Sequence, residues 1–557
     1  MEKFSKLPYE RVELEEMKKG YADLVARLKN AKSGEEQWAV HQDYYKLTKR
    51  ISTQSTIAQI RYDIDTTDEF YDKENEYYDS FGPEWQNCLN EYQKVLFNSP
   101  YRDYLEKKLG PVAFKNMEIA IKSFDEKLIP LLQEENELVT KYTKLIATAK
   151  IEFEGETYNL SLMTKFTTSQ DRDVRKRAVK AMSDYFLTVT DEIDDLYDKM
   201  VKNRTKQARM LGFENYIPLG YMRMNRNSYG QAQVENFRKQ VKEAFVPFVS
   251  EIHEKRRKRI AVDKLKFYDN GVYFTNGNPA PIGTPEEILG AGKKMYEELS
   301  PETAEFIDFM MDHELFDVLG RKTKRQGGYM TFLPDYKAPF IFANFNATSG
   351  DVDVITHECG HAFQGFVTRN DEITEHNDIT METAEIHSMS MEYFTYGWMD
   401  KFFGDRKDDY LTMHLEDSII FVPYGCMVDE FQHIVYANPD MTPAERKEVW
   451  KKLEETYRPH IDFDGDPFFG EGGYWQRQSH IFQSPFYYID YVLASVCAMQ
   501  FKVKMDEDYK AAFKDYLKLC NLSAKDFYEP MLSQVGLNSP FADGCIESLV
   551  GKLKEKV

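Results

Sequence analysis

Apolar residues recur three and four positions apart over most of this 557-residue chain, and this spacing lets a helix bury one face. The clearest stretches are residues 11–31, 35–62, 84–108 and 113–147. Pro100, Pro111 and Pro130 fall where helices can start or kink, as proline requires. No fixed repeat period accompanies the pattern. We therefore expect a mainly α fold.

Three stretches interrupt the helical pattern. Residues 151–158 alternate around Gly155, which predicts a small hairpin, and we place the end of an N-terminal helical region there, giving domains 1–150 and 151–557. Residues 270–284 are rich in Gly, Asn and Pro and predict a loop. Residues 327–346 predict two short strands.

The charge balance excludes some partners. With 72 Lys and Arg against 93 Asp and Glu, the formal charge is -21, so the surface repels phosphate backbones and nucleic acid is not an expected partner. One basic run, residues 255–259, departs from this balance. We interpret it as a solvated helix face, with a recognition patch as the alternative.

The six cysteines are scattered and lack CxxC spacing, which indicates a reducing compartment. No window approaches 18 consecutive apolar residues, and the first residues contain no apolar signal core. We therefore expect a soluble, cytoplasmic protein without a membrane partner. The sequence does not indicate its oligomeric state.

The segment His357-Glu358-Cys359-Gly360-His361 has the HExxH spacing of a metal-binding motif. On a helix, histidines four apart share one face, so both imidazoles can bind one tetrahedral metal ion at ~2.0–2.1 Å. Glu358 lies next to this pair and can accept a proton from a zinc-activated water. The flanking residues are mostly apolar, so both histidines should be largely buried. Burying two polar rings costs free energy unless they have a partner, and a shared metal ion would provide one. The motif predicts a zinc-dependent peptidase.

A catalytic zinc needs a third protein ligand. Gln364 and Val367 exclude the metzincin spacing, so the ligand comes from further along the chain. Spacing alone does not choose among the candidates, which are Glu375, His376, Asp378, Glu382, Glu385, His387 and Glu392. Glu382, Glu385 and Glu392 share one face of a predicted helix, where carboxylates are costly unless they are paired or bound to metal.

Several motifs together resemble the oligoendopeptidase F and Pz-peptidase branch of the thimet-oligopeptidase-like zinc metallopeptidases. The resemblance covers most of the chain and is strongest from about 325 to 500. The motifs that carry it are Gly327-Gly328-Tyr329, Ala343-Asn344-Phe345, the histidine motif, Glu385-Ile386-His387-Ser388 with Glu392, and His480 followed by Pro485-Phe486-Tyr487-Tyr488-Ile489-Asp490-Tyr491. It implies a two-lobed, clam-like helical fold with a deep channel, a small β element near the site, and short unstructured peptides as substrates.

The resemblance also implies residue roles. The family's third ligand is a Glu followed by Ser three residues on and Glu seven residues on, and Glu385, Ser388 and Glu392 fit this pattern. One zinc per chain would then bind His357, His361 and Glu385. Asp353, one turn before His357, and Glu392 are candidates to accept the free N–H of a ligand.

Other matches concern the substrate. The segment at Gly328 and Tyr329 could pair with an extended peptide by strand addition. His480 and the tyrosines after it resemble the group that binds the substrate carbonyl. Tyr488 is our choice, although it follows His480 by one position fewer than expected, and Tyr487 and Tyr491 are the alternatives. Residues 470–473 contain three glycines and predict a mobile loop beside this group.

We therefore expect a zinc endopeptidase for short peptides. Two alternatives stay open: a carboxypeptidase relative that releases dipeptides, and a helical scaffold that binds peptides without cleaving them. Glu358 argues against the scaffold, because zinc binding does not need it. The site would also accept cobalt or manganese.

Overall fold

The computed structural model describes residues 1–325 and 327–557, which pack into two compact units. The first unit comprises residues 1–122, 280–407 and 501–537, and the second comprises 123–279, 408–500 and 538–557. Each unit is thus assembled from three separate segments of the chain. The expected domain division at residue 150 stays a prediction.

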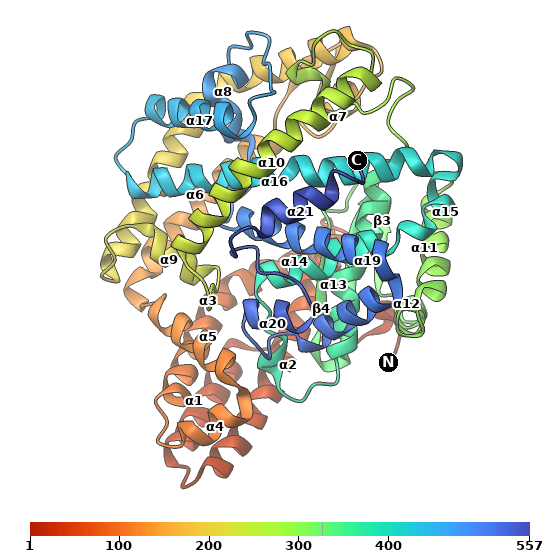
Figure 1. Ribbon diagram of the computed structural model, residues 1–557. Coiled ribbons are helices and arrows are strands. Elements are labelled where there is room, and N and C mark those ends of the chain that lie inside the picture. Colours follow the sequence, from red (N-terminus) through yellow and green to blue (C-terminus); the bar gives the residue numbers. More distant parts are fainter. Residues whose placement is uncertain (326) are drawn as a thin grey trace. The chain divides into compact units, whose positions relative to one another are not determined.

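The first unit is mainly helical. Its helices are α1 (Leu14–Asn30), α2 (Gly34–Ile64), α3 (Glu69–Phe97), α4 (Arg102–Leu109), α5 (Pro111–Lys122), α11 (Pro285–Leu299), α12 (Pro301–Asp312), α13 (Ser349–Thr368), α14 (Met381–Phe394), α15 (Asp400–Phe403) and α20 (Tyr528–Gln534). In Figure 1, α1, α3, α4 and α5 lie side by side in red and orange. Tyr44 of α2 stacks on Tyr92 of α3 in their shared core, with ring centroids 4.2 Å apart.

A three-stranded sheet also belongs to the first unit. Its strands are β3 (Phe316–Leu319), β4 (Tyr329–Leu333) and β5 (Ala338–Phe345), in the order β3-β5-β4. β5 pairs parallel with β3 and antiparallel with β4, where Tyr329 faces Phe342 and Leu333 faces Ala338. The central strand is the most buried, and β4 lies at the edge of the sheet.

The second unit contains a small hairpin of β1 (Ile151–Phe153) and β2 (Glu156–Tyr158) among helices. Its helices are α6 (Ile129–Ala147), α7 (Thr164–Thr167), α8 (Arg172–Met210), α9 (Tyr216–Arg223), α10 (Gln231–Arg259), α16 (Lys407–Ala437), α17 (Pro443–Tyr457), α18 (Ser479–Gln483) and α21 (Cys545–Leu553). The helix α19 (Tyr488–Leu522) runs from the second unit into the first.

Short helical turns connect these elements. They are Phe4–Lys6, Glu126–Leu128, Phe267–Asp269, Pro334–Tyr336, Thr374–Asn377, Tyr396–Trp398, Gly404–Arg406, Phe469–Gly473 and Tyr474–Arg477. Among the described residues, no helix is both long and apolar enough to cross a membrane.

The mainly α fold is confirmed, and so are the hairpin at 151–158 and the two strands within 327–346. Residues 84–108 and 113–147 each showed one continuous helical pattern, but each contains a break, one before α4 and one before α6. Polar turn residues at these breaks can form hydrogen bonds with the backbone. Pro111 and Pro130 stand at helix starts as expected.

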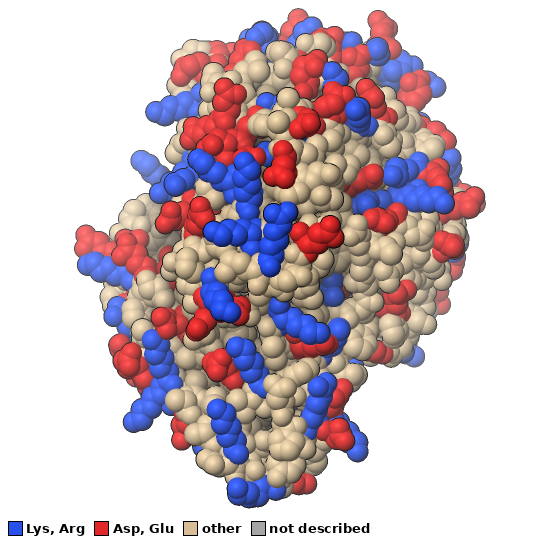
Figure 2. Space-filling view, turned by 90° about the vertical axis from the view of Figure 1, so that its left-hand side faces the viewer, with Lys and Arg blue, Asp and Glu red and all other residues tan. Residues whose placement is uncertain are grey.

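Acidic and basic side chains are interspersed on the face shown in Figure 2, despite the net charge of -21. The basic run of α10 is only partly a solvated face. Lys255 and Lys258 are exposed, but Arg256 is buried, with 1% of its surface exposed. The interpretation of this run as a solvated face is therefore wrong for Arg256.

Candidate metal centre

The helix α13 carries the histidine motif in the first unit. Asp351 holds the start of this helix, because its carboxylate accepts hydrogen bonds from the backbone N–H groups of Asn346 and Ala347, both at 2.8 Å. One face of α13 is buried, and His357, Glu358 and His361 lie at its partly exposed margin. The helical spacing thus places these three side chains together on a partly exposed margin.

The neighbouring helix α14 packs against α13 at an unusually close point. A Cβ atom on Gly360 would lie 2.5 Å from Ser388 Cα and 2.7 Å from the His387 carbonyl oxygen. Only glycine therefore allows this approach. The sequence motif offered Gly360 no role, but the structure shows that it sets the distance between the two helices.

The close packing brings Glu385 of α14 to the two histidines. Glu385 Oε2 lies 3.3 Å from His357 Nε2 and 3.7 Å from His361 Nε2. Two ligands of a tetrahedral zinc ion, each ~2.0–2.1 Å from it, lie ~3.4 Å apart, so these spacings fit such an ion. Across the described residues, these are the one group of three or more His, Cys, Asp or Glu side chains whose donor atoms all lie within 4.8 Å of one another.

Two further contacts orient these donors. His357 Nδ1 lies 2.6 Å from Glu392 Oε1, which fixes the ring so that Nε2 faces Glu385. Ser388 Oγ donates to Glu385 Oε2 at 3.2 Å. Glu392 thus has the contact expected of a supporting carboxylate. The same role for Asp353 stays a prediction.

The electrostatics of the two histidines differ. Burial alone would lower the pKa of His357, but hydrogen bonds to Glu385 and Glu392 outweigh it and raise the pKa well above its ordinary value. Burial lowers the pKa of His361 to about 4, which keeps this ring neutral. Two carboxylates therefore favour positive charge at His357, while His361 offers a lone pair.

Several candidates for the third ligand are engaged elsewhere. Glu375 accepts hydrogen bonds from His41, at 2.9 Å, and from Tyr45. His376 pairs with Asp371. Glu382 accepts a hydrogen bond from Thr380 at 2.6 Å. These contacts are with groups other than the histidine pair.

Glu358 lies beside the edge strand β4. Burial raises the pKa of Glu358, and a hydrogen bond from the backbone N–H of Met330 partly opposes this. Tyr329 of the same strand stacks on Phe342, with centroids 5.0 Å apart, and donates to Asp63 at 2.7 Å. Gly328 directly precedes the strand. The strand edge and the carboxylate are therefore neighbours.

The second unit gathers His480 and the three candidate tyrosines. The His480 ring centroid lies 4.9 Å from that of Tyr488, 6.0 Å from Tyr487 and 5.8 Å from Tyr491. Gln478 donates to His480 Nδ1 at 2.8 Å and accepts from Tyr424 at 2.7 Å. A neutral His480 therefore carries its proton on Nε2.

The glycines at 470–473 have a packing reason. Gly472 has a positive φ of 81°, and a Cβ atom there would collide with the carbonyl oxygen of Lys447 on α17. A Cβ atom on Gly473 would lie 2.5 Å from the Phe468 ring. Close contacts with neighbouring elements thus explain these two glycines without invoking a mobile loop.

Comparison with known proteins identifies the family. The chain matches the Peptidase M3 N-terminal domain over residues 4–124 and Peptidase family M3 over residues 165–279 and 304–549. It therefore belongs to peptidase family M3, in the oligoendopeptidase F branch.

Individual relatives agree with this assignment. The structure of PZ peptidase A with an inhibitor is 46% identical in sequence, covers all of this chain and 99% of that one, and has a TM-score of 0.94. The Group B oligopeptidase PepB of Streptococcus agalactiae is 22% identical over 89% of this chain and 85% of its own length. The oligoendopeptidase F structure from Enterococcus faecium, at 15% identity and a TM-score of 0.63, shares the fold.

Proposed function

We propose that this peptidase is a zinc-dependent oligopeptidase whose ion is held by His357, His361 and Glu385. The observation that carries the proposal is the convergence of two imidazoles and one carboxylate at spacings of 3.3 and 3.7 Å. Two nitrogen ligands and one oxygen ligand from the protein are typical of catalytic zinc, which keeps a fourth position open.

A zinc ion at this position would polarise the peptide carbonyl and lower the pKa of a water molecule to ~7. Glu358 is the proposed base that takes a proton from the attacking water and delivers it to the leaving amine. Its partly buried carboxylate has a raised pKa, which makes it a better proton acceptor than an exposed glutamate.

Short peptides are the proposed substrates. β4 is an edge strand, and its Met330 N–H points to Glu358, so an extended peptide paired with this edge would run past the proposed base. The names of the relatives, an oligopeptidase and an oligoendopeptidase, support the same substrate class. The six free cysteines support a reducing, cytoplasmic location.

Stabilisation of the developing oxyanion is assigned to Tyr488, with His480 assisting in substrate binding. Tyr488 is the tyrosine whose ring lies nearest to His480, and its hydroxyl keeps its proton because burial raises its pKa. Tyr487 and Tyr491 are the alternatives from the same cluster.

The substitution Glu358→Gln tests this mechanism, because it removes the base and keeps the size of the side chain. We expect kcat for an internally quenched peptide with both ends blocked to fall by ~10²–10⁴. Metal content, measured by elemental analysis, should stay at one zinc per chain. Retention of more than about a tenth of wild-type activity would contradict a role for Glu358 as general base.

A further inference from the structure

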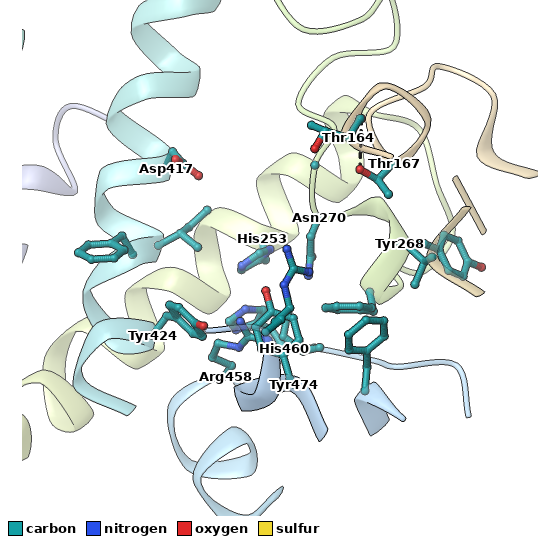
Figure 3. Close-up of a pocket in the computed structure, with 18 of the residues that line it drawn as sticks. Thr164, Thr167, His253, Tyr268, Asn270, Asp417, Tyr424, Arg458, His460 and Tyr474 are labelled. Carbon is teal, nitrogen blue, oxygen red and sulfur yellow. Dashed lines mark hydrogen bonds between the residues drawn. The ribbon is translucent and has the colours of Figure 1, made fainter. Parts of the chain in front are cut away.

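A second polar site lies wholly within the second unit. It is a cavity of about 460 Å³ bounded by residues of α7, α8, α10, α16 and the segments 267–273 and 458–461. Figure 3 shows His253, Asn270, Arg458 and His460 converging near its centre, and Tyr268 at its side. Its size is in the range of cavities that hold small ligands or the end of a peptide.

Arg256 of α10 is the central observation. It lines this cavity and is 1% exposed, yet among the described residues no carboxylate forms an ion pair with it. It contacts neutral groups: it donates to the Asn270 carbonyl oxygen at 3.2 Å, to Asn270 Oδ1 at 3.3 Å and to His253 Nδ1 at 2.8 Å, and it lies 5.0 Å from the centroid of the Tyr273 ring. Its Nε atom has no partner. A buried guanidinium without an anion is unfavourable unless a ligand supplies one.

The two histidines supply a further donor. The rings of His253 and His460 stack with centroids 3.7 Å apart. Because a guanidinium only donates, His253 Nδ1 accepts from Arg256, and the neutral ring carries its proton on Nε2. That Nε2 atom is buried and has no hydrogen-bond partner, and His253 as a whole is 4% exposed. Burial lowers the pKa of both rings, that of His460 to about 3, so both are neutral.

The charge of the cavity is positive. Three arginines line it, namely Arg256, Arg458 and Arg477, against one acidic side chain, Asp417. Arg458 is paired with Glu454, and Asp417 accepts a hydrogen bond from Tyr273 at 2.9 Å. An excess of cationic donors in a chain with a net charge of -21 marks a place for an anion.

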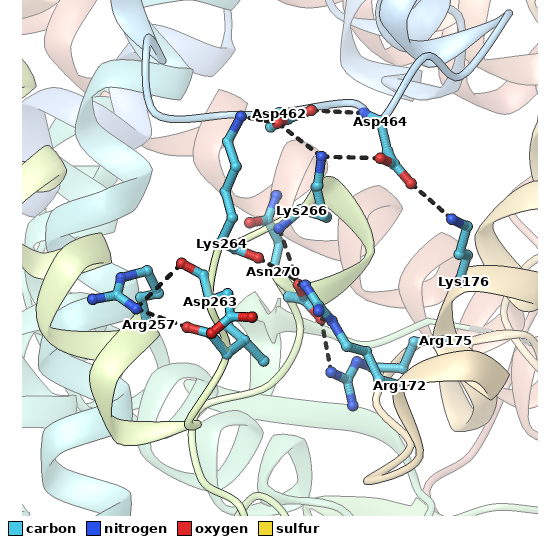
Figure 4. Close-up of polar contacts among 12 residues, drawn as sticks. Arg172, Arg175, Lys176, Arg257, Asp263, Lys264, Lys266, Asn270, Asp462 and Asp464 are labelled. Carbon is cyan, nitrogen blue, oxygen red and sulfur yellow. Dashed lines mark hydrogen bonds and ion pairs between the residues drawn. The ribbon is translucent and has the colours of Figure 1, made fainter.

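Ion pairs hold the walls of this cavity in place (Figure 4). Lys266 pairs with Asp462 at 3.0 Å and with Asp464 at 2.9 Å, which ties the segment before Asn270 to the segment after His460. The fully buried Asp269, next to Asn270, forms ion pairs with Arg172 and Arg175, both at 2.7 Å. The donors are therefore positioned before any ligand binds, which reduces the ordering that binding requires.

The rest of the lining suits a peptide. Tyr268, Tyr273, Tyr424 and Tyr474 offer aromatic surface, and Tyr488, the tyrosine assigned to the oxyanion, borders the same cavity. A ligand whose anionic end meets Arg256 could therefore place its apolar part on these rings.

We propose that this cavity binds a carboxylate of the substrate peptide, through Arg256 and the Nε2–H of His253. The assignment rests on the proposed peptidase function for the identity of the ligand. The chemistry of recognition rests on the cavity alone. An anion there would meet a guanidinium that has no carboxylate partner and an imidazole N–H that has no hydrogen-bond partner.

Calorimetric titration with matched peptides tests the proposal, and chromatography confirms that the peptides stay intact. N-acetyl-Leu-Phe as free acid and as amide tests a terminal carboxylate, while N-acetyl-Glu-Phe amide and N-acetyl-Gln-Phe amide test a side-chain carboxylate. We expect the wild type to bind the acid of at least one pair ~10-fold or more tighter than its amide, the range for a hydrogen bond to a charged group. Arg256→Gln should reduce this ratio to about twofold or less.

Arg257→Gln is the matched control, because Arg257 is the next residue on α10, pairs with Glu254 and does not line the cavity. It should keep the wild-type ratio. Equal affinity for acid and amide in both pairs, or a preference that survives Arg256→Gln, would overturn the proposal. If Arg256→Gln does not fold, His253→Phe keeps the stacked ring and removes the N–H, and an unchanged ratio there overturns it equally.

The result is independent of catalysis. A carboxylate preference that depends on Arg256, in a protein that cleaves no peptide, would support the site and reject the proposed function. Peptide cleavage without a carboxylate preference would support the proposed function and reject the carboxylate site.

Discussion

Each unit places two histidines near each other, but the charged side chains beside them differ. In the first unit, His357 and His361 lie beside Glu385 and Glu392. In the second unit, His253 and His460 stack on each other beside Arg256 and Arg458. The carboxylates raise the pKa of His357, whereas burial, together with the arginines, lowers the pKa of His253 and His460. The same side chain therefore favours a cation in one unit and an anion in the other.

Imidazole pairs therefore have no fixed preference for one kind of ligand. A neutral imidazole offers one lone pair and one N–H, and its neighbours decide which of them faces the ligand. At His357 the bond to Glu392 leaves Nε2 toward Glu385, while at His253 the bond from Arg256 to Nδ1 leaves the proton on Nε2, which has no hydrogen-bond partner.

The largest effect is expected from removing Glu385, the proposed third ligand beside His357 and His361. Glu385→Ala should reduce zinc content to near zero and activity with it, because two neutral imidazoles bind zinc far more weakly than a set completed by an anion. Elemental analysis of purified protein measures the loss. Glu382→Ala is the control, since Glu382 lies on the same helix and accepts a hydrogen bond from Thr380, and it should keep one zinc. The reverse pattern would show that Glu385 is not the ligand.

A smaller effect is expected from Tyr488, which lines the cavity of the second unit. Tyr488→Phe removes the hydroxyl and keeps the ring, so the contacts with His480 and Phe421 should persist. If it stabilises the oxyanion, kcat falls by ~10²–10³ with little change in KM. If Tyr488 only lines the cavity, KM rises and kcat stays. Tyr487→Phe and Tyr491→Phe, measured alongside, show whether a neighbour holds the role.

The smallest effect is expected from Glu392, which contacts His357 Nδ1 and is proposed to support the metal site without binding the ion. Glu392→Gln keeps a hydrogen-bond acceptor for His357 but removes its charge, so zinc affinity should fall by ~10–100-fold. Competition with a chelator of known affinity measures the change. Affinity equal to the wild type would mean that the charge of Glu392 does not contribute to metal binding.

The sequence predicted what depends on local periodicity. The pattern of 11–31 corresponds to α1 at Leu14–Asn30 and that of 35–62 to α2 at Gly34–Ile64, because α1 and the first half of α2 bury residues three and four positions apart. The helical spacing likewise placed His357 and His361 on one face. Breaks between consecutive helices were missed, since the apolar spacing continues on both sides of a short turn.

Contacts between elements could not be predicted from spacing. Periodicity left seven candidates for the third ligand, and only the resemblance selected Glu385, because the position of α14 on α13 is a tertiary property. The cavity of the second unit gave still less signal. Arg256 appeared as one member of a basic run, and nothing in the sequence joined it to His460, which lies on a distant segment.

Gly360 has a consequence for how changes in this protein are tolerated. The residue contributes no ligand atom, yet the space for its absent side chain decides how near Ser388 and Glu385 come to α13. A lineage that replaced it with alanine would keep every residue of the HExxH pattern and every ligand, while the helix bearing Glu385 would have to move. A comparison of sequence motifs alone would find nothing missing in such a descendant. The distance between α13 and α14, which brings Glu385 to the two histidines, would nevertheless have changed. The geometry of this site thus depends on one position where a side chain has no room.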